Sequence, residues 1–184
     1  MITRTLFALL LVLFLGSNFL SPAATCQQRD HLTPQEVDLV KEAQVLDKRI
    51  DVFVKAAERR MMIITGATAP TTKQSKKDAE RWGELPTGSR AELVSDIARI
   101  LDEAITNIDD VSARDERNPL ISKSLRKLAQ SVNTIMAQLK PLSAEAKSDA
   151  EVASFELLNE DAQSILEAAN KLPPEVEKKT KKSQ

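Results

Sequence analysis

Apolar residues recur at alternating spacings of three and four along a segment that begins at Thr33 and ends at Gly66. This spacing is typical of an amphipathic α-helix, whose other face carries the charged residues. Thr33, Pro34 and Glu36 form a capping-box pattern with proline at the first helical position, which predicts the start of the helix. Gly66 predicts its end. We therefore expect one long helix over 33–65, with this apolar stripe: Val40, Ala43, Leu46, Ile50, Phe53, Ala57, Met61 and Ile64.

Three further segments show the same periodicity, and they predict helices over about 89–113, 119–140 and 143–172. Ser89, Asn118 and Ser143 are the predicted N-caps. Pro141 and Pro173 are predicted to end the third and fourth helices, because proline cannot donate a backbone hydrogen bond. The three stripes contain Leu93, Ile97, Ile100, Leu101, Ala104, Ile108 and Val111; then Ile121, Leu125, Leu128, Val132, Ile135 and Leu139; then Ala150, Val152, Phe155, Leu158, Ala162, Ile165, Ala169 and Leu172.

Four apolar stripes that need partners predict an all-α fold, a mostly antiparallel bundle of four main helices in one domain over 33–172. The linker over 67–88 is long for a compact domain. We therefore expect a short helix near 76–82 that places Trp82 on the bundle. The way in which the first helix joins the others stays open.

The N-terminus has the features of a cleavable secretory signal over residues 1–25. Arg4 precedes an apolar run over 6–15, and small residues follow over 21–25. The apolar run has about ten residues, whereas a membrane-spanning helix needs roughly 20. The sequence thus predicts an exported protein of the bacterial periplasm or cell envelope, with a polar lead-in over 26–32.

Cys26 follows the small residues and is the only cysteine, so no intramolecular disulfide can form. The run Ala23-Ala24-Thr25-Cys26 resembles a degenerate lipobox, but it lacks leucine at the first position and glycine or alanine before the cysteine. In the lipoprotein alternative Cys26 carries lipid and anchors the protein to a membrane. In the other alternative, cleavage after Ala23 releases a soluble exported protein.

The charge and composition of the chain bear on the kind of partner that it binds. The chain of 184 residues has 26 basic and 27 acidic side chains, and removal of Arg4 with the signal leaves 25 against 27, a net charge of −2. This balance does not favour nucleic acid. The last segment, 173–184, is rich in lysine and nearly free of apolar residues, so we expect a disordered basic tail. A protein partner is expected, and a homo-oligomer stays open.

The sequence predicts no catalytic, cofactor or metal residues. The only histidine, His31, precedes the first helix and is expected to be solvated, which excludes Glu-x-x-His metal sites in a bundle core. Asp96, Glu103 and Asp110 repeat every seven residues and share a helix face, where carboxylates bind hard cations. A solvated acidic face opposite the basic residues of the first helix is the preferred interpretation.

The adjacent residues Arg59 and Arg60 suggest a partner or phosphate site. A basic flank that complements the helix dipole explains them as well.

Leu32-Thr33-Pro34-Gln35-Glu36 resembles the Leu-Thr-x-x-Gln motif of periplasmic helical stress proteins related to the Spy chaperone, without its final glutamine, and 142–146 is a looser match. The resemblance implies an exported helical protein that offers a surface to unfolded proteins or envelope partners. Our main hypothesis is a non-catalytic binding or structural protein of the envelope. A chaperone-like stress protein is the first alternative, and an enzyme with a site of scattered Asp, Glu and Arg is the second.

Overall fold

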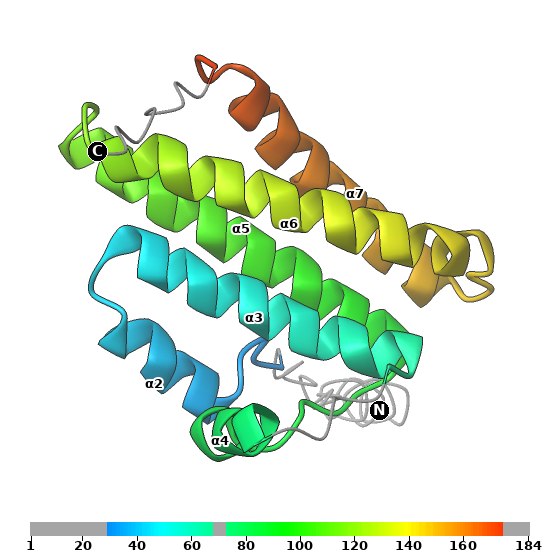
Figure 1. Ribbon diagram of the computed structural model, residues 1–184. Helices are drawn as coiled ribbons and strands as arrows, with labels where there is room; N and C mark the ends of the chain where they lie inside the picture. Colours follow the sequence, from blue (N-terminus) through cyan, green and yellow to red (C-terminus); the bar gives the residue numbers. More distant parts are fainter. Residues whose placement is uncertain (1–28, 68–72, 175–184) are drawn as a thin grey trace, which may run out of the picture.

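The computed structural model describes residues 29–67 and 73–174, and it confirms the all-α class (Figure 1). The described residues contain six helices and no strand, and 79% of them are helical. The predicted signal, Cys26 and the basic tail beyond residue 174 lie outside the described residues. The helices are α2 (Pro34–Glu42), α3 (Leu46–Thr65), α4 (Lys73–Trp82), α5 (Arg90–Arg114), α6 (Pro119–Ala144) and α7 (Asp149–Asn170).

The single helix predicted over 33–65 is wrong, because the chain leaves the helical path at 43–45 and α3 folds back along α2. Arg49 Nε donates to the carbonyl oxygen of Ala43 at 3.0 Å. A side chain of α3 thus provides a hydrogen-bond donor for a carbonyl group at the end of α2. The reversal brings Glu36 to Arg60, 24 residues along the chain. On an unbroken helix these residues would lie about 36 Å apart.

The predicted caps are observed at three helix starts. Thr33 and Ser89 each form a complete capping box, with Glu36 and Glu92 respectively. The side chain of Asn118 accepts the Leu120 N–H at 3.0 Å. At the other end of α3, Gly66 has a φ of 65° and closes the helix as predicted. These termini are set by local residues, which is why the sequence identifies them.

Two predicted boundaries are wrong. Pro141 lies inside the last turn of α6, which continues to Ala144. Proline removes only one hydrogen bond there, the one to Ala137, and both residues are exposed, so water can replace it. Ser143 therefore belongs to α6 and donates to the Lys140 carbonyl. The N-cap of α7 is Ser148, which accepts the Glu151 N–H at 3.2 Å.

The four long helices pack around one core. α3 and α7 each contact both α5 and α6, and within the described residues they do not contact each other. α5 and α6 also contact, and the pairs that follow one another along the chain run antiparallel (Figure 1). Two neighbouring pairs run parallel. Ion pairs fix their register: Lys123 with Asp47 at 2.6 Å between α6 and α3, and Arg90 with Glu151 at 2.8 Å between α5 and α7.

The core is mostly aliphatic, and the predicted stripes on α3, α5 and α6 supply most of it. Leu128 is 0% exposed. On α7 the buried residues are Leu158, Ala162 and Ile165, whereas Ala150 is exposed and Val152 is 42% exposed. The predicted stripe on this helix was therefore too long at its N-terminal end. None of the described helices is long and apolar enough to cross a membrane.

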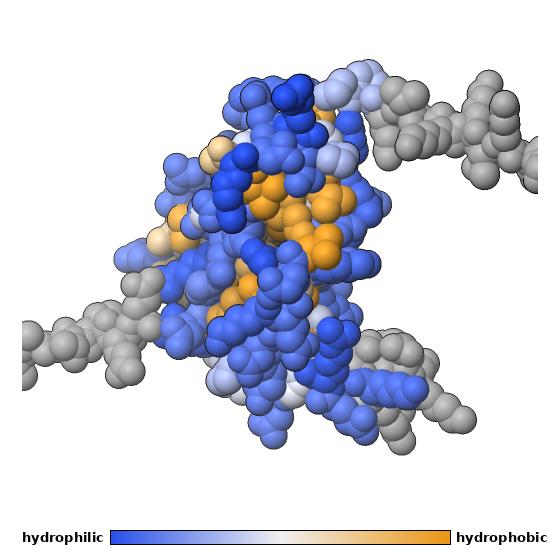
Figure 2. All heavy atoms as spheres, turned by 90° about the vertical axis from the view of Figure 1, so that its left-hand side faces the viewer, coloured by the Kyte–Doolittle hydropathy of each residue, from blue (hydrophilic) through white to orange (hydrophobic). Residues whose placement is uncertain are grey.

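α2 and α4 lie on the opposite side of the α3, α5 and α6 group from α7 (Figure 1). α4 contacts α2, and Trp82 at its end is 9% exposed and joins the core, as expected from the sequence. Seen from the end at the left of Figure 1, the surface is mostly polar, and apolar residues reach it in a central patch (Figure 2). α2, α4 and the non-helical segment 83–88 thus form a cover on one side of the long helices.

Candidate functional site

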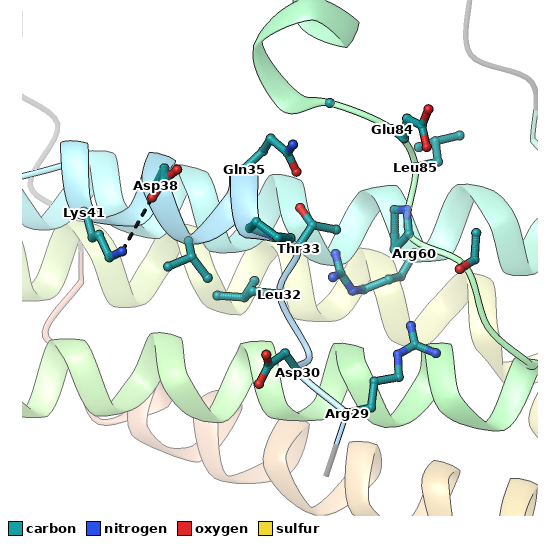
Figure 3. A pocket seen from close by; sticks show the side chains of 15 residues that line it. Arg29, Asp30, Leu32, Thr33, Gln35, Asp38, Lys41, Arg60, Glu84 and Leu85 are labelled. Carbon is teal, nitrogen blue, oxygen red and sulfur yellow. Dashed lines mark ion pairs between the residues drawn. The ribbon is translucent and has the colours of Figure 1, made fainter. Parts of the chain in front are cut away.

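A large cleft lies between α2 and segment 83–88, and we call it the α2 cleft (Figure 3). Its volume is about 930 Å³. One wall is the chain from Arg29 into α2, and the other consists of residues 83–87. Arg60 of α3 lines the cleft between these walls. A preformed cavity with a few polar groups is the usual form of a ligand site.

Glu36 and Arg60 form a buried ion pair beside the α2 cleft. Glu36 is 0% exposed and Arg60 is 1% exposed. Arg60 donates from its two terminal nitrogens to the two oxygens of the Glu36 carboxylate, at 2.9 and 2.8 Å. The same nitrogens donate to the carbonyl oxygens of Ala56 and His31. Glu36 also accepts the Thr33 N–H in the capping box, so one carboxylate starts α2 and holds it on α3.

Arg59 holds the other wall of the cleft. Its guanidinium donates to the carbonyl oxygens of Gly83 and Glu84, and it lies 5.6 Å from the centre of the Trp82 ring. Its Nε lies 3.2 Å from Glu36 Oε1, but the N–H is not directed at the oxygen and forms no hydrogen bond. Burial lowers the pKa of Arg59, and the charge of Arg60 adds to this effect. Arginine nevertheless stays charged, because its ordinary pKa is far above neutrality.

Asp96 of α5 is the second buried carboxylate of the network. It accepts a hydrogen bond from Arg29 at 2.8 Å, and Arg60 Nε lies 3.7 Å from the same oxygen. Burial raises the pKa of Asp96, while the positive charges of Arg29 and Arg60 act to lower it. Arg29, Arg59 and Arg60 thus face Glu36 and Asp96. The network ties the lead-in, α2, α3, α5 and segment 83–88 together.

The structure places the candidate residues in surroundings that differ from those expected from the sequence. His31 is not simply solvated, since its Nε2 lies 2.8 Å from Glu103 Oε2. The heptad carboxylates do not act together: Asp96 is buried, Glu103 pairs with His31, and Asp110 is exposed. Among the described residues, no group of three or more His, Cys, Asp or Glu could hold a metal ion. Arg59 and Arg60 are partners of Glu36 and not part of a solvated basic face.

A second charged region lies where α5 meets α7. Burial raises the pKa of Asp161 to about 6, and the negative charges of Asp102 and Glu160 add to the shift. None of these three carboxylates forms an ion pair with a described residue. Like charges close together make ionisation of Asp161 unfavourable. This face therefore carries uncompensated negative charge.

An apolar groove runs between the end of α6 and the start of α7, with a volume of about 510 Å³. Met136, Leu139, Phe155 and Leu158 supply most of its lining. It holds no charged side chain other than Lys140. It has fewer polar groups to orient a ligand than the α2 cleft.

Comparison of the chain with models of protein families, with curated proteins and with solved structures gives no match. The site therefore rests on the geometry of this chain alone.

The sequence interpretation missed the double role of Glu36 and the burial of Arg60. The capping-box pattern identified Glu36 as a helix start, and the arginine pair was visible, but nothing local connects the two. The apolar spacing of three and four continues through 43–45, and these residues include no glycine or proline. The sequence therefore does not indicate the chain reversal that brings Glu36 and Arg60 together. A buried arginine opposite a buried glutamate follows only from the packing.

Proposed function

We propose that this protein is an exported, non-catalytic binding protein of the cell envelope, and that its partner is held in the α2 cleft. The observation that carries this proposal is a preformed cleft whose buried charges already neutralise one another. A cavity of about 930 Å³ lies open between two walls, and both walls are fixed by Arg59 and Arg60. Fixed walls lower the entropic cost of binding a partner.

The buried carboxylates beside the cleft favour binding over catalysis. A general acid or base must be free to exchange a proton with a substrate. Glu36 is fully buried and accepts three hydrogen bonds, from the Thr33 N–H and from two nitrogens of Arg60. Asp96 is held by Arg29. These carboxylates stabilise the fold, and the cleft presents its exposed residues for contact with a partner.

Export and an envelope location rest on the N-terminal pattern of a secretory signal. The net charge of −2 after its removal and the small number of aromatic residues favour a protein partner over nucleic acid.

Site-specific photo-crosslinking in the cells that produce the protein tests the proposal. A photoreactive residue replaces Gln35 or Thr87, which line the α2 cleft, and the control replaces Gln130 on the exposed face of α6. We expect a discrete crosslinked partner from both cleft positions and none from Gln130, in the envelope fraction. Equal crosslinking at all three positions, or a crosslinked form in the cytoplasm only, would contradict the proposal.

A further inference from the structure

Residues 83–87 of segment 83–88 line the α2 cleft, and part of the backbone of this segment has no partner in the described fold. It lies between α4 and α5 and is not helical. Leu85, Thr87 and Gly88 form no backbone-to-backbone hydrogen bond with another described residue, and Pro86 has no N–H to donate. A non-helical stretch with free backbone donors and acceptors beside a cleft is a template on which an extended peptide can pair.

Arg59 keeps this segment in place. It donates to the carbonyl oxygens of Gly83 and Glu84. Trp82, the residue directly before the segment, is buried in the core. At Gly83 a side chain would lie 3.0 Å from atoms of Gln35 on α2, and the φ of 66° favours glycine there. The segment therefore approaches α2 closely at one end, and the cleft lies beyond that point.

The charged side chains of the cleft that form no ion pair with a described residue are acidic. Asp30 and Glu84 are exposed and form no ion pair with a described residue. The cationic groups of the lining are paired: Arg29 with Asp96, Arg60 with Glu36, and Lys41 with Asp38 at 3.5 Å. Leu85 is 48% exposed, one of the most exposed large apolar residues described. Charge complementarity thus selects a basic side chain, and Leu85 offers contact to an apolar one.

From these observations we infer that the α2 cleft binds an extended peptide segment that carries a basic side chain next to an apolar one, with its backbone paired to segment 83–88. This inference rests on the proposed function and names the class of its partner. Backbone pairing supplies affinity that does not depend on sequence, while Asp30, Glu84 and Leu85 supply the preference.

The test uses the full chain and a phage-displayed library of random peptides of about twelve residues, a length that exceeds the cleft wall. We expect enrichment of peptides with Lys or Arg beside an apolar residue. Synthetic versions of the enriched peptides are then titrated by fluorescence anisotropy. In the variant Asp30→Asn/Glu84→Gln we expect affinity to fall about tenfold. N-methylation of alternate peptide nitrogens should reduce affinity by at least about tenfold, because it removes backbone donors.

The matched control is Asp109→Asn/Glu167→Gln, which removes the same two charges from exposed positions on α5 and α7. We expect a change of less than about twofold for this variant, as for charges outside the site. Equal losses in the two variants would show binding through net charge alone and overturn the inference. Unaltered affinity of the N-methylated peptides, or no enrichment from the library, would also overturn it. If crosslinking from Gln35 and Thr87 still captures a partner, the proposed function stands and only the peptide class is rejected.

Discussion

Substitution of Arg60 by methionine tests whether the buried ion pair holds α2 on α3. Methionine keeps much of the length and volume of the side chain but removes its charge and all of its donors. Glu36 then remains 0% exposed without its main partner. The carbonyl oxygens of Ala56 and His31 also lose their donor. Buried groups that lose hydrogen bonds in this way destabilise the folded state.

The magnitude follows from the geometry. Removing one partner of a buried ion pair costs about 3–5 kcal/mol. Arg59 Nε remains 3.2 Å from Glu36 Oε1 and offsets part of this loss, so we expect the lower end of the range, about 3 kcal/mol. For a chain of this length each kcal/mol changes Tm by about 2–4 °C, so the melting temperature should fall by about 6–12 °C.

Urea unfolding is followed by circular dichroism and by fluorescence of Trp82, the only tryptophan. The control is Lys55→Met on the same helix. The Lys55 side chain is 41% exposed and its ion pair with Glu58 is 3.8 Å long, so its loss should change stability by less than about 0.5 kcal/mol.

The double variant Glu36→Gln/Arg60→Met separates the ion pair from simple packing. With the buried negative charge absent, the additional cost of Arg60→Met should fall to about 1.5 kcal/mol or less. If Arg60→Met costs less than about 1 kcal/mol, or costs the same with and without Glu36, the ion pair does not stabilise the fold in the way argued.

Four other expectations can be measured directly. Leu128→Asp places a charge at a fully buried site and should destabilise the fold by at least about 3 kcal/mol in urea unfolding, whereas Leu157→Asp at an exposed site of α7 should cost less than about 1. Asp161 has a pKa raised to about 6, so its ionisation opposes folding as pH rises from the ordinary value of 3.8 through 6. Asp161→Asn should therefore stabilise the protein at pH 8, by about 1 kcal/mol after allowance for solvent screening, and change little below pH 4. Glu151 has a pKa lowered to about 2 by its arginine partner, so its contribution is present above 4.5 and is lost as pH falls toward 2. Glu151→Gln should lower the urea midpoint at pH 7, and the difference should vanish near pH 2. If Cys26 is lipidated, Cys26→Ser should release the protein from membranes, and an unchanged membrane fraction would exclude lipidation.

The candidate site was visible in the sequence only as separate pieces. Glu36 was identified through the capping box, and Arg59 and Arg60 were identified as a basic pair. Glu36 and its partner Arg60 lie 24 residues apart on different helices. Asp96, the second carboxylate near Arg60, lies on α5. A contact over that distance depends on the chain reversal at 43–45, for which the residues show no glycine or proline. The cleft is a consequence of this reversal.

Sequence alone determined the all-α class, three of the helix starts and the core residues of α3, α5 and α6. These features depend on local capping and on a periodicity of three and four, which the chain shows directly. Tertiary packing decided where the first long stripe breaks, why Pro141 is tolerated, and which charges are buried together. A helix can bend back only if its separated halves gain more from contact with one another than from continuing, and that gain lies in pairs such as Glu36 and Arg60. No local pattern indicates this stabilisation, because it comes from residues that are in contact only after the chain has folded.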